Sequence, residues 1–254
     1  LTSMKPRENV PLSSYSTMRL GGNARYLTEI KSAQEIPDAI EWAEKNGLSV
    51  MMIGIGSNII WQDQGFDGLI LVNKIPGFEL QKQEFSSFVT IGAGEPWDSV
   101  VARIVNENLS GVEHLSLIPG TAGATPVQNV GAYGREIADV LVCLNAYDRS
   151  EKKMVVLAKG DCDFSYRASR FNRQDKDRFF ITTITLTLSH EKSLPPFYPT
   201  LQAYLTENNI TEYTPKNIRE AVIAVRNRRL PDPAKVANCG SFFKNPIVGY
   251  QQLQ

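Results

Sequence analysis

The chain has 254 residues, more than the roughly 100 to 200 of a usual single domain, which predicts two domains or one domain with an appendage. Its 27 basic residues balance its 27 acidic ones, which gives no global electrostatic case for a nucleic-acid or anionic-membrane partner. No apolar run approaches the roughly 18 to 20 residues that span a bilayer. Three widely spaced cysteines and two histidines indicate neither a disulfide framework nor a metal site. We therefore expect a cytoplasmic protein with no nucleic-acid partner, no membrane insertion and no metal.

The first predicted elements form a small α/β unit. Residues 33–46 carry apolar side chains at helical spacing, with Ser32 as the expected N-cap and Gly47 as the C-terminal stop. Residues 48–53 and 68–73 are short apolar runs that predict buried strands.

Residues 54–60, GIGSNII, follow the first of these strands. Open α/β sheets bind ligands at the carboxyl ends of their strands. The segment fits neither a P-loop nor GxGxxG, so a structural turn and a phosphate-binding turn both remain open.

The rest of the chain predicts a β-rich second unit and a final helix. Valine, isoleucine and threonine mark the strands, and apolar side chains at helical spacing mark the helices. The predicted strands are 88–91, 140–147, 153–158 and 179–188, and the predicted helices are 97–107 and 214–229. The charged, proline-bearing stretch 189–199 is interpreted as a connector near a domain boundary.

Residues 117–135, LIPGTAGATPVQNVGAYGR, are the most unusual stretch of the sequence. Four glycines allow close backbone approach, and successive backbone N–H groups can form an anion site without a charged side chain. A flexible linker is the alternative. The absence of serine and lysine, and the spaced apolar residues Ile118, Val127 and Val130, favour an ordered ligand loop.

Three further segments contain groups that could carry chemistry. In 164–172, FSYRASRFN, an arginine fork could orient a carboxylate, or the arginines could form surface ion pairs. In 224–229, AVRNRR, the arginines could clamp a phosphate or simply end a helix. In 238–246, NCGSFFKNP, glycine lets Ser241 project beside Phe242 and Phe243, and the serine could donate a proton. A β-turn with a buried phenylalanine pair is the alternative there.

These motifs, together with NVPLSSYSTMRLGGNARYL near the N-terminus and LPDPAKVA before NCGSFFKNP, are collinear over nearly the whole chain. In that order they resemble the UDP-N-acetylenolpyruvoylglucosamine reductases of peptidoglycan synthesis, the MurB family. The resemblance implies an α+β fold of the vanillyl-alcohol-oxidase (PCMH) type that binds FAD without a Rossmann fingerprint. It implies an FAD-binding domain over 9–190, with subdomains of about 9–74 and 75–190. The connector and the beginning of a substrate-binding domain, apparently truncated, would occupy 191–254.

The resemblance also assigns roles to individual residues. Arg167 matches the arginine that stabilises the enolic intermediate, and Ser241 matches the general acid. The implied FAD contacts are Gly54, Ile55, Gly56, Ser57, Asn58, Gly120, Thr121, Gly123, Ala124, Thr125, Gln128, Asn129, Gly131 and Ala132. The implied substrate contacts are Tyr133, Tyr166, Tyr198, Arg226, Arg229 and Asn245.

The implied reaction uses NADPH to reduce FAD, after which the enolpyruvyl group of the sugar nucleotide receives the hydride at its β-carbon and a proton from Ser241. We expect residues 117–135 to face Arg167 and Ser241 across a cleft. Bulk in this loop would displace the cofactor, which predicts folded but colourless protein for Gly123→Val. We expect a monomer, although no residue pattern determines the oligomeric state.

One departure concerns the C-terminal end. The family carries a further glutamate that partners the arginine, and no residue up to Gln254 matches it. If the protein is this short, we expect FAD binding with substrate reduction slower by about 10² to 10⁴. Two alternatives follow: a flavin oxidase of the same superfamily, and a binding protein with little catalysis.

Overall fold

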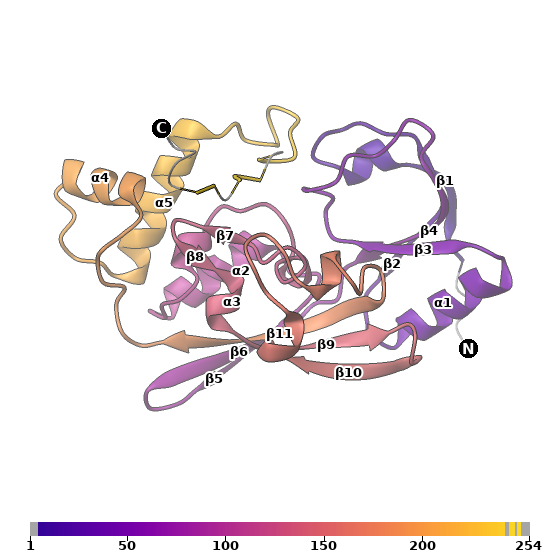
Figure 1. Ribbon diagram of the computed structural model, residues 1–254, viewed down its shortest axis with the longest axis horizontal. Coiled ribbons are helices and arrows are strands. Elements are labelled where there is room, and N and C mark those ends of the chain that lie inside the picture. The colour runs from indigo at the N-terminus through magenta and orange to yellow at the C-terminus, as the bar shows by residue number, and fades with distance from the viewer. Residues whose placement is uncertain (1–4, 242–243, 247, 250–254) are drawn as a thin grey trace.

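A computed structural model describes residues 5–241, 244–246 and 248–249. Two sheets form the body of the molecule, one with strand order β1-β2-β4-β3 and one with order β10-β9-β11-β6-β5 (Figure 1). The first sheet contains β1 (Arg7–Pro11), β2 (Asn23–Ile30), β3 (Ser49–Ile53) and β4 (Phe66–Asn73). The second contains β5 (Phe78–Lys82), β6 (Ser86–Gly92), β9 (Leu141–Asp148), β10 (Lys153–Ala158) and β11 (Phe179–Ser189).

The remaining elements are helices and a small ribbon, β7 (Gly131–Ala132) with β8 (Arg135–Glu136). The α-helices are α1 (Glu35–Lys45), α2 (Trp97–Asn106), α3 (Ile137–Val140), α4 (Pro199–Glu207) and α5 (Pro215–Arg229). The 3-10 turns are η1 (Leu12–Tyr15), η2 (Glu113–Leu115), η3 (Ala122–Ala124), η4 (Lys159–Cys162) and η5 (Arg170–Asn172).

The first sheet confirms the predicted α/β unit. Strand β4 lies between β2 and β3, parallel to both, and is buried from Gly68 to Asn73. A continuous apolar run is typical of such a central strand. Helix α1 buries the predicted apolar face and is followed by Gly47 at φ 64°. The predicted N-cap Ser32 is wrong, because the residue that precedes α1 is Gln34. The Ser32 carbonyl lies further upstream and accepts a hydrogen bond from the Glu35 N–H.

The second sheet is entirely antiparallel. Burial alternates along β11, which places one of its faces in the core, and α2 packs its valines and Ile104 there. Strand β10 coincides with the predicted range. Among the longer elements, β1, β2, β5 and α4 lie outside the predicted ranges. Strand β5 is mostly exposed and α4 buries only Leu201 and Leu205, so neither has a strong apolar pattern.

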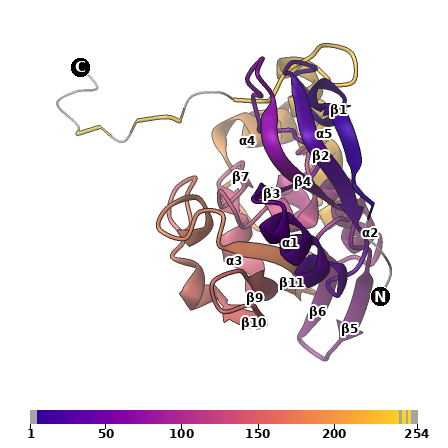
Figure 2. The same cartoon turned by 90° about the vertical axis from the view of Figure 1, so that its right-hand side faces the viewer.

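The two sheets share one apolar cluster. Tyr147 of β9 and Phe180 of β11 pack with the buried face of α1, and the Asn73 side chain donates to the Ile181 carbonyl over 2.9 Å. Figures 1 and 2 place α1 between the first sheet and the β9–β11 part of the second. The relative position of the two sheets is therefore fixed by side-chain packing as well as by the backbone connection.

Helices α4 and α5 form a separate layer at one end of the molecule (Figure 1). Phe197 lies among the buried residues of both helices, and Tyr133 from the glycine-rich stretch packs against them. Helix α5 begins with Thr214, whose hydroxyl accepts the Asn217 N–H over 3.1 Å as an N-cap.

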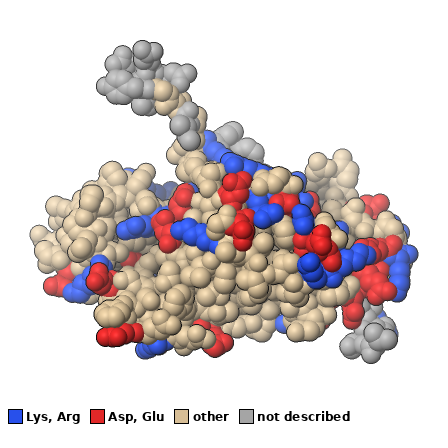
Figure 3. Space-filling model, turned by 60° about the horizontal axis from the view of Figure 1, so that its bottom comes forward, with Lys and Arg blue, Asp and Glu red and all other residues tan. Residues whose placement is uncertain are grey.

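Charges of both signs are interspersed on the face shown in Figure 3. In the part of the chain that the structure describes, no helix combines the length and apolarity that a membrane span requires.

Candidate active site

The glycine-rich stretch 117–135 is an ordered loop and not a linker. The Ala122 N–H donates to Glu95 and the Gly123 N–H donates to Ala93, each over 2.9 Å, so this part of the loop lies against the chain before α2. Val130 is buried, and Ile118 and Val127 pack against the main core. These are the three apolar residues that indicate an ordered loop.

The structure adds a packing reason for glycine at position 123. A Cβ there would lie 2.4 Å from the Ala93 Cβ and 3.0 Å from its Cα. Bulk at this position therefore collides with the side chain and the backbone of Ala93. Gly123 therefore allows the loop to pack closely on Ala93, and its predicted contact with FAD stays a prediction.

Residues 54–58 meet this loop directly. The Ser57 hydroxyl donates to the Pro119 carbonyl over 3.0 Å, and the Asn58 amide donates to Gln128 Oε1 over 2.6 Å. A Cβ on Gly54 would lie 2.6 Å from Thr121 Oγ1, so the two loops are in close contact. The segment begins one residue after β3, as the sequence predicts.

The contact between residues 54–58 and the loop 117–135 leaves several backbone N–H donors unpaired in the described part of the chain. Within the described residues, the N–H groups of 55–58 have no hydrogen-bond acceptor. Gly56 has φ 69°, and Gly120 has φ 143° with only Ser57 Oγ near its missing Cβ, at 3.5 Å. Consecutive free N–H groups at a left-handed turn form a cradle for an anion. A pyrophosphate fits this cradle.

The Arg167 side chain contacts the glycine-rich loop 117–135 directly, so it does not face the loop across a cleft. Its Nη2 donates to the Gly131 carbonyl over 2.5 Å, and its Nη1 donates to the Asn129 carbonyl over 3.5 Å. Glu136 is 3.6 Å away as an ion-pair partner. A Cβ on Gly131 would lie 2.6 Å from Arg167 Nη1. Glycine at 131 thus leaves room for this guanidinium, which explains the difference from the expected arrangement.

The turn that carries Arg167 is bonded to the same loop at two further points. The Ser169 hydroxyl, completely buried, donates to the Val127 carbonyl over 2.7 Å. The Asn129 amide donates to the Ser165 carbonyl over 3.1 Å. Arg167 itself has φ 52°, a left-handed conformation that is uncommon outside glycine.

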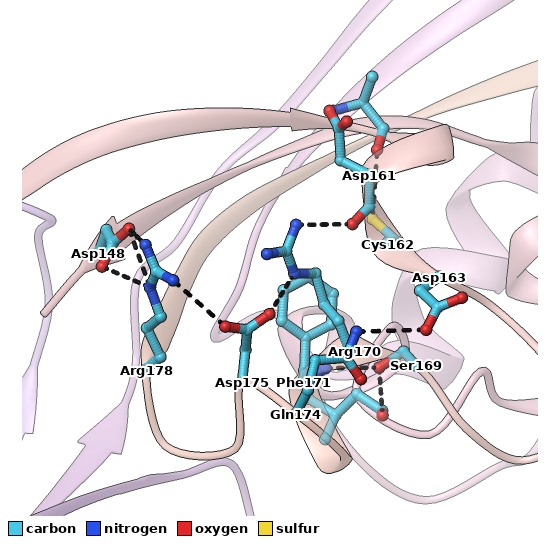
Figure 4. A network of polar contacts seen from close by, with 12 residues as sticks. Asp148, Asp161, Cys162, Asp163, Ser169, Arg170, Phe171, Gln174, Asp175 and Arg178 are labelled. Atoms are coloured by element: carbon cyan, nitrogen blue, oxygen red, sulfur yellow. Dashed lines mark hydrogen bonds and ion pairs between the residues drawn. The ribbon is translucent and has the colours of Figure 1, made fainter. Parts of the chain in front are cut away.

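A polar network fixes the other end of this turn (Figure 4). Asp175 lies between two arginines, at 2.7 Å from Arg170 and 3.3 Å from Arg178. Arg178 also donates from Nε and Nη2 to the carboxylate of Asp148 in β9. These hydrogen bonds hold the pKa of Asp148 below its ordinary value. Arg170 is therefore a structural residue, which agrees with the ion-pair alternative for that position. Tyr166 is exposed, with Arg167 Cζ at 5.1 Å from its ring centroid.

The predicted substrate residues Tyr133, Tyr198, Arg226 and Arg229 gather at α5. The rings of Tyr133 and Tyr198 are 6.0 Å apart, edge to face. Burial raises the pKa of Tyr133, whereas nearby Arg226 and Arg229 act to lower it. Burial lowers the pKa of Arg226, and its buried Nε has no hydrogen-bond partner among the described residues. A buried, incompletely paired guanidinium is a typical anion ligand.

One contact that the sequence did not indicate fixes α5 beside the loop. Arg219 donates from Nη1 and Nη2 to the two carboxylate oxygens of Asp98 in α2, over 2.6 and 2.9 Å, and Asp98 also accepts the Leu117 N–H. Burial acts to raise the pKa of Asp98, but these hydrogen bonds outweigh it and the pKa lies below its ordinary value. The only sequence signal was an acidic residue in the first turn of a predicted helix.

The segment with the predicted general acid lies beyond α5. Gly240 has φ 77°, and Ser241 and Asn245 are exposed. No contact joins either residue to Arg167 among the described residues. Phe242 and Phe243, predicted to lie beside Ser241, are outside the residues that the structure describes.

Comparison with known proteins gives a matching family model and several similar curated proteins. The FAD binding domain family matches residues 24–156. The UDP-N-acetylenolpyruvoylglucosamine reductase of Ralstonia nicotianae is 43% identical over 242 residues, which are 94% of this chain and 70% of the relative. That of Cupriavidus pinatubonensis is 40% identical over 245 residues, 96% of this chain and 72% of the relative.

Solved structures share the fold. The UDP-N-acetylenolpyruvylglucosamine reductase of Thermus caldophilus has a TM-score of 0.70 at 22% identity and covers 96% of this chain, with 76% of its own chain matched. Cholesterol oxidase from B. sterolicum has a TM-score of 0.54 at 13% identity, over 74% of this chain and 38% of its own. These similarities and the FAD binding domain match confirm the predicted fold class.

Proposed function

The chain belongs to the UDP-N-acetylenolpyruvoylglucosamine reductase family, and we propose that it uses NADPH and FAD to reduce the enolpyruvyl group of UDP-N-acetylglucosamine enolpyruvate in peptidoglycan synthesis. The observation that carries this proposal is the 43% identity over 94% of the chain. The paired loops at 54–58 and 117–135 support it, because they provide a site for a dinucleotide. The product is UDP-N-acetylmuramate.

We assign the FAD pyrophosphate to the free N–H groups of 55–58 and the facing backbone at Gly120. The other predicted cofactor residues, Gly123 among them, lie in the two loops 54–58 and 117–135 and stay proposed FAD contacts. Bound FAD supplies the two-electron chemistry, and the protein orients it and excludes competing reactions.

Arg167 is the proposed electrostatic catalyst. Negative charge grows on the substrate carboxyl as hydride reaches the β-carbon, and a guanidinium held in advance lowers the energy of that charge. Two backbone carbonyls and Glu136 hold the Arg167 head in place before substrate arrives. Asn129 holds both Glu136, over 2.7 Å, and the turn at Ser165. Orientation of Arg167 therefore requires little rearrangement.

The substrate diphosphate is proposed to bind at Tyr133, Tyr198, Arg226 and Arg229. The unpaired Arg226 Nε gives this cluster an unused donor, and the tyrosine pair gives it an apolar wall with two hydroxyl groups. Tyr166 and Asn245 remain proposed contacts.

Ser241 is proposed to donate the proton that completes the lactyl group. The left-handed Gly240 just before it turns the chain so that the serine can project from the segment.

A visible spectrum tests the whole proposal. Purified protein should carry flavin absorbance, lose it on addition of NADPH without oxygen, and regain it on addition of UDP-N-acetylglucosamine enolpyruvate. Reduced flavin that reacts rapidly with oxygen but not with this substrate would instead indicate an oxidase.

The location, assembly and domain limits complete the proposal. We propose a monomer in the cytoplasm, with no nucleic-acid partner, and the domain boundaries at 9–190 and 191–254 stay predictions.

A further inference from the structure

The segment 231–241, between α5 and the end of the chain, contains no helix or strand but has a defined shape. The Asp232 carbonyl accepts the N–H groups of Lys235 and Val236 over 2.9 and 2.8 Å. The Asn238 amide donates to Val236, and its Oδ1 accepts the Gly240 N–H over 3.1 Å. These bonds fix the backbone up to the residue before Ser241.

The same segment is tied to a turn more than two hundred residues earlier in the chain. The Asn238 N–H donates to the Thr17 carbonyl over 3.1 Å. Arg19 Nη2 donates to the carbonyls of Pro233 and Ala234, over 3.1 and 2.5 Å. In Figure 1 the yellow segment after α5 runs toward the indigo loops of the first sheet.

The turn formed by residues 15–19 also packs against residues 54–58, which we call the cofactor loop. The Thr17 N–H donates to the Gly56 carbonyl over 3.3 Å. A Cβ on Gly56 would lie 2.0 Å from the Tyr15 carbonyl oxygen, so the two backbones touch. A continuous set of contacts therefore leads from the proposed pyrophosphate cradle, through this turn, to the Ser241 segment.

The Arg19 side chain makes no other polar contact among the described residues. Arg19 is exposed, has φ 55°, and forms no ion pair within the residues that the structure describes. A guanidinium donates from a rigid planar fork, which suits two neighbouring carbonyls. The arginine of the STMRLGG motif is thus committed to the backbone of a distant segment.

We propose that Arg19 is a positioning residue for the proton-transfer step, because it fixes the Ser241 segment relative to the cofactor loop. This inference rests on the role proposed for Ser241. Arg19 touches neither reacting group, and delivery of hydride from NADPH does not require Ser241. A loss of Arg19 should therefore slow only the half-reaction that reduces the enolpyruvyl substrate.

Hydrogen exchange of the FAD-bound protein gives the direct test. In Arg19→Ala, the amides of 235–240 should exchange about tenfold faster, because two charge-assisted bonds to their segment are lost. Amides of α1 should be unchanged. Arg25→Ala is the matched control, since Arg25 is an exposed arginine of β2, six residues after Arg19, and it pairs with Asp67 at 3.1 Å.

Stopped-flow kinetics of the same variants gives the second test. In Arg19→Ala, flavin reduction by NADPH should stay within about twofold of wild type, whereas reoxidation by substrate should slow about 10- to 100-fold, the effect of a misplaced group. Arg19→Lys should fall between the two, because it keeps the charge without the fork.

Unchanged exchange at 235–240 in Arg19→Ala would overturn the inference, as would equal slowing of both half-reactions or the same effects in Arg25→Ala. A wild-type flavin that the enolpyruvyl substrate does not reoxidise would count against the proposed function. The exchange measurement still decides whether Arg19 holds the segment in that case.

Discussion

Arg226→Met is the most informative substitution, because the structure predicts opposite effects on stability and on binding. The Arg226 Nε is buried without an acceptor, and no carboxylate lies within ion-pair distance among the described residues. An unsatisfied buried polar group costs about 1 to 3 kcal/mol. Methionine has a similar reach and no polar group. We expect the ligand-free variant to be as stable as wild type or more stable by about 1 kcal/mol.

Binding of a uridine diphosphate should weaken in the same variant. A hydrogen bond to a charged group contributes about 1.5 to 3 kcal/mol, which corresponds to a Kd about 10- to 150-fold higher. Urea denaturation measures the free energy of unfolding, and titration calorimetry with UDP measures Kd.

Arg228→Met is the control for both measurements. Arg228 is two residues further along α5, exposed, and pairs with Glu207 at 3.4 Å. Its substitution should change stability by less than about 0.5 kcal/mol and leave Kd near the wild-type value. If Arg226→Met binds UDP as tightly as wild type, or loses more than about 2 kcal/mol of stability, Arg226 has a structural role and the reasoning fails.

Three further substitutions test the support of the site. Gly123→Val should lower the free energy of unfolding by about 3 kcal/mol, because its side chain meets Ala93; a colourless protein with wild-type stability in urea would contradict this. Asp175→Asn should lower the free energy of unfolding, measured in urea, by about 1 to 2 kcal/mol at unchanged FAD content, because it weakens contacts to two arginines. An unchanged free energy of unfolding would show that the network is dispensable. The Asp98 carboxyl has a lowered pKa in the folded state, so its contribution is present above about pH 4 and lost as the pH falls through the folded value. The stability lost between pH 7 and 3 should therefore be smaller in Asp98→Asn, and an equal loss would exclude this linkage.

Local patterns in the sequence predict much of the fold. Helices α1, α2 and α5 follow from apolar periodicity, because each buries a clear apolar face. Strand β10 follows from its alternation, although its inward residues Val155 and Leu157 are only half-buried against the core. Strands β2 and β5 do not, since their exposed faces carry charged and polar residues that dilute the pattern. Composition alone favours an ordered ligand loop at 117–135 over a flexible linker, and the order of the loop is confirmed.

Contacts between distant residues lie beyond such patterns. The gathering of Tyr133 and Tyr198 is expected only through the family resemblance, and the Asp98–Arg219 pair is not expected at all. The bond from Arg19 to Ala234 joins positions 215 residues apart. Spacing in the sequence carries no information about such a pair, because the relative position of the elements is set by packing of the whole chain.

The cluster shared by α1 and the second sheet has a consequence for synthesis on the ribosome. Phe180, which covers part of the apolar face of α1, follows Ile75 in the chain by 105 residues. At about 5 to 20 residues per second, the newly made first layer waits roughly 5 to 20 s before this cover emerges. During that interval the part of the α1 face that Phe180 covers is open to chaperones and to other nascent chains, so misassembly at this surface is possible early in translation.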